Sequence, residues 1–467
     1  MTRPIFHLLT ITALCGLSIG TGSFAAEVDD VDSSPASASV STPGYAVIVS
    51  RSTNDQAEWR RVVDALVERH RAEVIVHEGD VSATLSELRA VFPRYTCFVA
   101  TPEEAGRDFV AAVHRLTRRL DDDPYTDTFW GILTGYTPEA ALAIARHNRP
   151  LVVRKVAGGT RFAMECCEQG LWYDELVKNK LVRKQPGEKP EQLHGPDDTT
   201  QAMVEVLNQY QPDLFITSGH ATERDWQLGY RYRNGQFRCQ DGRLFALDTQ
   251  GQRHPIDSPN PKVYMPVGNC LMGHINGRQC MALAWMNSAG VKQMLGYTVP
   301  TWFGYGGWGC LNYFLEQPGR YTFTEAFFAN QHALIYRLNT ADNHHARRGL
   351  EFDSIVVAFY GDPAWSARMA RQELAFEQSL EASADGRYTF EVRGKDADSF
   401  GPIDTNGSQR QPRPLVAFFE RRLTDIEIVE GTELNPVIAD DFLLVDRPAQ
   451  CDPTRTYRVT FRARPVQ

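Results

Sequence analysis

The sequence lacks any long apolar run after its first 25 residues. No later run approaches the roughly 20 apolar residues that a helix needs to cross a bilayer, so we expect no membrane span in the mature chain. At the start, Arg3 precedes an apolar stretch from Ile5 to Ile19, and small residues follow up to Ala25. This layout is typical of a secretory signal peptide over residues 1–25. It predicts export to the periplasm or the extracellular space.

The sequence also lacks a basic block and any interleaving of aromatic with basic residues. Its formal net charge is −9, with 49 Lys and Arg against 58 Asp and Glu, and both signs are scattered along the chain. A protein that tracks a phosphate backbone needs clustered positive charge. We therefore expect no nucleic-acid partner. Residues 26–43 are acidic and then rich in Ser, Ala and Thr, which predicts a disordered lead-in.

Cysteine pairs with the CxxC spacing of zinc sites are absent, so we expect no zinc. Removing Cys15 with the signal peptide leaves eight of the nine cysteines, and in an oxidising compartment each is by default a disulfide or a buried thiol. That default also applies to Cys270. The pair His344 and His345 could bind a metal, but a solvated helix start is the commoner explanation. We assign no metal ligands.

From Gly44 onward, short β-branched runs alternate with helical patterns. This alternation predicts an α/β fold with a parallel sheet and helices on both faces. At 467 residues the chain exceeds one usual hydrophobic core, so several domains are expected. The expected strands are 45–50, 73–77, 96–100, 130–134, 151–156, 214–218, 263–267, 293–297 and 355–360, with helices over 56–70, 83–91 and 201–209.

The C-terminal part has a different pattern. A helix is predicted over 367–381, and from Tyr388 short alternating strands with Pro, Asn and Asp turns predict a small β-sandwich of immunoglobulin type. Polar segments 185–200 and 230–262 read as surface loops. The expected domains are an N-terminal α/β subdomain (44–195), a second, catalytic α/β subdomain (196–383) and the β-sandwich (384–467).

Two of the predicted strands end in residues with catalytic chemistry. The strand from Leu214 runs into Gly219-His220, and the strand from Val263 runs into Gly268-Asn269-Cys270. In a parallel sheet, functional groups collect at the carboxyl ends of strands, so neighbouring strands would present the imidazole and the thiol to one crevice. A cysteine attacks an acyl carbon as thiolate, and a histidine within reach supplies the base. The sequence therefore predicts a His220–Cys270 dyad.

Four segments in this order resemble the gingipains, a family of cysteine peptidases in the larger clan of caspases and legumains. They are Gly219-His220-Ala221-Thr222-Glu223-Arg224-Asp225-Trp226, Val267-Gly268-Asn269-Cys270, Gly296-Tyr297-Thr298-Val299-Pro300-Thr301-Trp302-Phe303-Gly304 and Phe359-Tyr360-Gly361-Asp362-Pro363. The resemblance implies a caspase-like sheet followed by a β-sandwich. It also implies a secreted endopeptidase acting on polypeptides.

Carried over by position, the resemblance implies that His220 is the acid and base and Cys270 the nucleophile. Backbone amides at Ala221 and Cys270 would hold the oxyanion. Trp302 or Phe303 would wall the pocket for the P1 side chain, the one before the scissile bond.

An acidic specificity residue in that family would correspond here to Glu165 or Glu168, which leaves a basic P1 preference open. Family members often bind calcium, but no calcium ligands are assigned in this sequence.

The chain departs from the family pattern at two points. Ala221 replaces the glycine after the histidine, and Ala157-Gly158-Gly159 stands where Arg-cleaving members have a Glu-Gly-Gly turn whose carboxylate steadies the histidine. A dyad without an acidic orienter is therefore expected. An alternative stays open, in which the chain keeps the fold without the activity and serves as a secreted binding module.

Overall fold

A computed structural model describes residues 44–401, 403, 413–448 and 450–466. The predicted signal peptide and lead-in lie outside the described residues. These described residues belong to one compact unit. No helix in the described part of the chain is long and apolar enough to cross a membrane.

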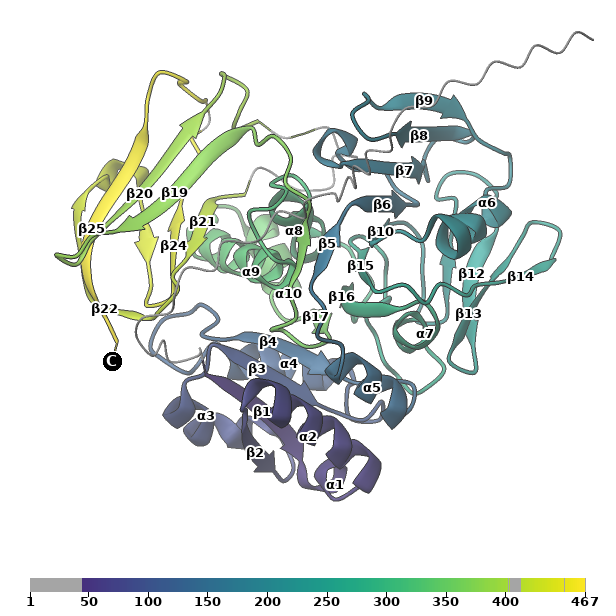
Figure 1. Ribbon diagram of the computed structural model, residues 1–467, viewed down its shortest axis with the longest axis horizontal. Helices are drawn as coiled ribbons and strands as arrows, with labels where there is room; N and C mark the ends of the chain where they lie inside the picture. The colour runs from purple at the N-terminus through teal and green to yellow at the C-terminus, as the bar shows by residue number, and fades with distance from the viewer. Residues whose placement is uncertain (1–43, 402, 404–412, 449, 467) are drawn as a thin grey trace, which may run out of the picture. The chain divides into compact units, whose positions relative to one another are not determined.

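The centre of the fold is a twelve-stranded sheet that is mixed and mostly parallel (Figure 1). Three neighbouring pairs are antiparallel: β16 with β17, β7 with β8, and β8 with β9. The α/β prediction is therefore confirmed. In order across the sheet the strands are β2 (Glu73–His77), β1 (Tyr45–Ser50), β3 (Tyr95–Val99), β4 (Phe129–Leu133), β17 (Val357–Tyr360), β16 (Val291–Tyr297), β15 (Lys262–Pro266), β10 (Leu214–Thr217), β6 (Lys155–Gly158), β7 (Gln169–Tyr173), β8 (Lys180–Lys184) and β9 (Glu191–His194).

The middle strands β10, β15 and β17 are buried at every position. A parallel strand covered on both faces reads as a continuous apolar run, which is why these segments stood out in the sequence. The helices that pack with the strands are α1 (Arg51–Asn54), α2 (Ala57–His70), α3 (Leu85–Val91), α4 (Arg107–Leu116), α5 (Pro138–Ala145), α6 (Thr200–Glu205), α7 (Met281–Ser288), α8 (Tyr305–Phe314), α9 (Phe323–Thr340) and α10 (His344–Asp353).

Two segments expected to be loops contain strands. Segment 185–200 includes β9, and segment 230–262 holds most of a four-stranded antiparallel sheet that packs beside α7. Its inward residues, such as Phe237 and Leu244, are buried. The loop prediction was wrong because the Gly and polar residues of the tight hairpins obscured the alternation of apolar and polar residues along these strands. The strands are β11 (Asp225–Gln227), β12 (Gln236–Gln240), β13 (Arg243–Leu247) and β14 (Arg253–Pro255).

The predicted helix over 367–381 is also wrong. This segment forms β18 (Ala367–Met369), which pairs with β5 (Leu151–Val153), and β19 (Phe376–Ala382), which pairs with β20 (Arg387–Gly394). Pairing with distant strands overrides local helix preference here. The strand expected over 151–156 divides accordingly, because β5 and β6 belong to different sheets.

The C-terminal part consists of two antiparallel sheets with their own core. One sheet has the order β19-β20-β25-β22, and the other has the order β21-β24-β23. Buried residues between them include Phe390, Leu443 and Phe461. Antiparallel strands begin already at Phe376, before the predicted start at Tyr388. The remaining strands are β21 (Leu415–Phe418), β22 (Leu423–Glu430), β23 (Val437–Ile438), β24 (Phe442–Val445) and β25 (Tyr457–Pro465).

Candidate active site

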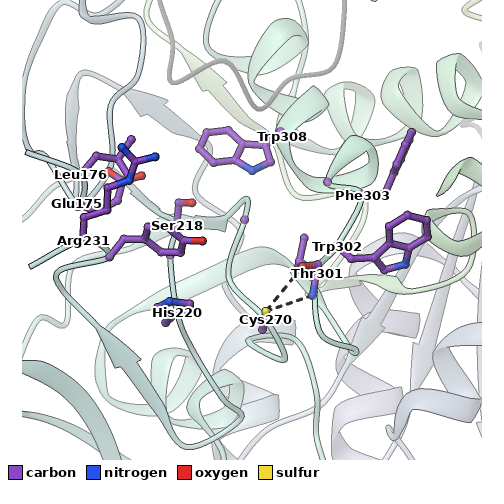
Figure 2. Close-up of a pocket in the computed structure, with 14 residues that line it drawn as sticks. Glu175, Leu176, Ser218, His220, Arg231, Cys270, Thr301, Trp302, Phe303 and Trp308 are labelled. Carbon is purple, nitrogen blue, oxygen red and sulfur yellow. Dashed lines mark hydrogen bonds between the residues drawn. The ribbon is translucent and has the colours of Figure 1, made fainter. Parts of the chain in front are cut away.

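The carboxyl ends of β10 and β15 lie side by side. The two strands are parallel neighbours, with Leu214 opposite Val263 and Thr217 opposite Pro266. The chain leaves β10 toward His220 and β15 toward Cys270, and both residues line one cavity of about 620 Å³. Figure 2 shows the two side chains at the edge of this cavity. His220 and Cys270 therefore lie at one cavity, as the sequence pattern predicts.

Cys270 is a half-buried free thiol. The backbone N–H of Thr301 donates to its Sγ at 3.2 Å, and the thiol points toward the Thr301 carbonyl oxygen at 4.0 Å, as the dashed lines in Figure 2 indicate. An amide donor aimed at sulfur stabilises the thiolate form that attacks acyl carbons. The next residue, Leu271, has a φ of 56°, an unfavourable backbone angle for a branched side chain that is common at functional sites.

His220 is exposed at the cavity edge, and its imidazole stacks on the ring of Tyr230. The ring centroids are 4.4 Å apart and the planes differ by 23°. Among the described residues, no hydrogen bond joins His220 to Cys270, and no carboxylate bonds the imidazole. Catalytic hydrogen bonds are often formed only when substrate is bound, so the open geometry is compatible with a dyad.

Asn269, which is fully buried, connects the two strand ends. Its Nδ2 donates to the carbonyl oxygen of Gly219 at 3.2 Å, and its Oδ1 accepts from the Thr217 hydroxyl at 2.5 Å. Thr217 in turn lies 2.9 Å from the hydroxyl of Tyr264 on β15. This buried chain of hydrogen bonds fixes the backbone before His220 relative to the backbone before Cys270.

The two amides expected to hold an oxyanion lie on these same turns. Next to Ala221, the backbone N–H of Thr222 donates to the carbonyl oxygen of Asp225, and the N–H of Gln227 donates to the carbonyl oxygen of His220. These hydrogen bonds do not involve the N–H of Ala221. Ala221 itself faces Trp226 in an isolated bridge. In the part of the chain that the structure describes, neither the Ala221 nor the Cys270 amide donates a hydrogen bond. Both donors are therefore available to a ligand.

Aromatic side chains line the other part of the cavity. Trp302 is 42% exposed, whereas Phe303 is buried, and both are among the lining residues. The indole of Trp308 covers Gly268, where a Cβ would come within 2.6 Å of the Trp308 Nε1 and the Ser218 Oγ. The aromatic wall predicted from the sequence is thus present, and Trp308 extends it.

Neither Glu165 nor Glu168 lines the cavity. Glu168 pairs with Arg154 at 2.7 Å, and both side chains are partly exposed. A different acidic residue is among the lining residues: Glu175 is 3% exposed, and its carboxylate accepts a hydrogen bond from the Thr160 hydroxyl at 2.6 Å. The expected positions of an acidic specificity residue, Glu165 and Glu168, are therefore corrected to Glu175.

Glu175 could have been found by the rule that located His220 and Cys270. It comes two residues after β7, which is parallel to β6, so the carboxyl end of β7 lies at the same edge of the sheet. The sequence pattern did not predict β7 as a strand. Its residues, QGLWY, contain a glycine and only partial alternation, which weakens the strand pattern.

One group of carboxylates could hold a metal ion, but it does not line this cavity. Ligand oxygens of Asp121, Asp123 and Asp127 lie within 4.8 Å of one another. Burial, together with the neighbouring charge of Asp121, raises the pKa of Asp127 to about 9. Mutual repulsion of this kind is also common where no ion binds, so the group assigns no cofactor.

The residues that line the cavity include the Cys270 thiol and the His220 imidazole, with Glu175 and Arg231 beside them. This set is suited to acyl transfer through a thioester, with the imidazole moving the proton. Comparisons of this chain with protein-family models, with curated proteins and with solved structures found no match.

Proposed function

We propose that this protein is an exported cysteine endopeptidase of the gingipain type, with His220 and Cys270 as its dyad. The observation that carries the proposal is the convergence of the two strand ends on one cavity. The thiol there is free, half-buried and receives the Thr301 amide, whereas thiols such as Cys280 and Cys310 are buried in the core. Cys270 is the cysteine that shares a cavity with an exposed histidine.

The reaction follows from the groups around the cavity. His220 takes the proton of the Cys270 thiol, and the sulfur attacks the carbonyl carbon of the scissile bond. The amides of Ala221 and Cys270 stabilise the oxyanion. The C–N bond then breaks as His220 gives its proton to the leaving amine. Water, deprotonated by His220, hydrolyses the thioester and returns the thiol and the carboxylic acid product.

The finer fold assignments belong to the same proposal. A caspase-like sheet in two subdomains, divided near residue 195, is compatible with a mixed sheet that takes strands from both sides of that point. The two packed antiparallel sheets after residue 376 are compatible with an immunoglobulin-like sandwich. Export to the periplasm or the extracellular space rests on the sequence of residues 1–25.

We propose that Glu175, and not Glu165 or Glu168, gives the enzyme a preference for basic P1 residues. Glu175 lines the cavity that holds the dyad, next to Arg231, and a negative charge in a shielded site attracts a cationic side chain. Substituting Glu175→Gln should reduce kcat/KM for Arg and Lys at P1 by roughly 10-fold to 100-fold relative to norleucine at P1. Glu165→Gln and Glu168→Gln are matched controls and should leave this ratio unchanged.

The dyad is tested by covalent labelling. A peptidyl acyloxymethyl ketone with Arg or Lys at P1 should add one label per chain, measured by intact mass. Cys270→Ala should abolish the label and His220→Ala should slow it strongly. Cys239→Ala, which removes another free, half-buried thiol, should label like wild type.

If no such ketone, with any P1 residue, labels the wild-type protein, the peptidase proposal fails. The alternative is then favoured, in which the aromatic cavity and the C-terminal sheets bind a partner without catalysis. Labelling that persists in Cys270→Ala would contradict the assignment of the nucleophile.

A further inference from the structure

The imidazole of His220 needs something to hold its orientation. In a cysteine–histidine dyad the ring must present one nitrogen to the sulfur and then to the leaving amine, and a hydrogen-bonded third group commonly fixes it. Within the described residues, no side chain hydrogen-bonds the His220 ring. The turn at Ala157-Gly158-Gly159 offers no carboxylate.

An aromatic ring occupies the face of the imidazole instead. The Tyr230 ring lies parallel to the His220 ring, with 4.4 Å between centroids and 23° between planes, and both residues line the cavity. Stacking restricts tilting of the imidazole about its side-chain bonds while leaving both ring nitrogens open to partners. It also favours the protonated ring, because the face of an aromatic ring attracts a cation.

The segment that carries Tyr230 is itself held at the cavity. The backbone N–H groups of Tyr230 and Arg231 both donate to the carbonyl oxygen of Glu175, at 2.7 and 3.2 Å. The Tyr232 hydroxyl donates to the carbonyl oxygen of Asp174 at 2.7 Å. The ring is 45% exposed, so its place against His220 depends on this backbone anchoring more than on burial in the core.

We propose that Tyr230 is a positioning residue for His220 and takes the place of an acidic orienter. The proposal rests on the peptidase function assigned above. The anchoring of Tyr230 then has a functional meaning. The residue whose carbonyl oxygen binds the Tyr230 backbone is Glu175, the acidic residue proposed above for P1 preference. One short segment thereby sets the relative positions of the general base and the specificity carboxylate.

The test compares Tyr230→Phe, Tyr230→Leu and Tyr230→Ala. Alkylation of Cys270 by iodoacetamide reports the action of His220 on the thiol without filling the P1 cavity. We expect the rate constant to fall roughly 10-fold to 100-fold in Tyr230→Leu and Tyr230→Ala, and to stay within about 3-fold of wild type in Tyr230→Phe. Because Tyr230 is exposed, the variants should stay folded, and their melting temperatures check this.

Equal rates in all three variants and wild type would overturn the proposal. A loss in Tyr230→Phe as large as in Tyr230→Ala would overturn it too, because the hydroxyl would then be responsible and not the stacked ring.

A second measurement is independent of catalysis. In protein labelled with ¹³C-histidine, the ring protons of His220, assigned with His220→Ala, should be shifted upfield by Tyr230 and should lose this shift in Tyr230→Ala. Identical shifts in wild type and Tyr230→Ala would refute the stacking even in an inactive protein. If the upfield shift is present but no ketone labels the protein, the stacking of Tyr230 on His220 is supported and the peptidase function is rejected.

Discussion

Substituting Asn269→Ala should uncouple the two catalytic turns. The substitution leaves the Gly219 carbonyl oxygen without its buried donor and the Thr217 hydroxyl without its acceptor. Leaving a buried polar group unsatisfied costs about 1–3 kcal/mol. Thr217 keeps its contact with Tyr264, and Gly219 is half-buried at the cavity. We therefore count part of each loss and expect the free energy of unfolding to fall by about 1–3 kcal/mol.

Activity should fall further than stability alone explains. The Gly219 carbonyl directly precedes His220, and a shift of about 1 Å in a catalytic group can reduce the rate roughly 100-fold. Urea unfolding measures the first effect, and iodoacetamide alkylation of Cys270 in the folded protein measures the second. Asn276→Ala is the control, because that side chain is exposed and donates a hydrogen bond to Glu223 at 3.0 Å. The stability of this variant should stay within about 0.5 kcal/mol of wild type.

A double-mutant cycle identifies the bond that matters. Thr217→Val keeps the shape of the side chain and removes the hydroxyl that donates a hydrogen bond to the Asn269 Oδ1. If the two residues act together, the effects of Thr217→Val and Asn269→Ala on stability should deviate from additivity by about 0.5–3 kcal/mol. Strict additivity, or an Asn269→Ala variant that is as stable and as reactive as wild type, would refute the reasoning.

Three further substitutions test other parts of the structure. Gly268→Ala should raise KM roughly 10-fold, because the added methyl group overlaps the Trp308 indole; unchanged peptide kinetics would contradict the cavity geometry. Burial and the nearby acidic charges raise the pKa of Asp127 to about 9, so the wild-type free energy of unfolding should fall as pH rises from about 4 to about 9. Asp127→Asn should remove this loss, and its advantage in melting temperature should be largest near pH 9 and vanish near pH 4. Burial alone would raise the pKa of Asp362, but the hydrogen bond from His70 together with the nearby charges of His70 and Arg69 lowers it. The stabilisation from Asp362 is therefore present above its unfolded pKa and lost as pH falls through its lower folded value, so Asp362→Asn should destabilise the protein at pH 7 and much less in acid, as measured by urea unfolding.

Much of the order of elements could be predicted from the sequence. Continuous apolar runs such as 214–218 and 263–267 mark buried parallel strands, because a strand covered on both faces carries apolar side chains at most of its positions. The Gly-rich turns after them identify His220 and Cys270 without any knowledge of which strands are neighbours. The polar hairpins of 230–262 and the strands after 367 were misread, because their pairing partners lie far away in the chain and local composition does not record them.

The remaining site residues depend on the order of strands in the sheet. The sequence by itself determined the α/β alternation and the two reactive side chains at strand ends. Only the tertiary structure decided that Glu175, and not Glu165 or Glu168, lines the cavity, because β7 lies beside β6 and its carboxyl end faces the same edge. The stacking of Tyr230 on His220 and the bonds of Asn269 to Thr217 and Gly219 are likewise tertiary. They join residues through sheet neighbours and anchored loops, and spacing along the chain carries no information about such contacts.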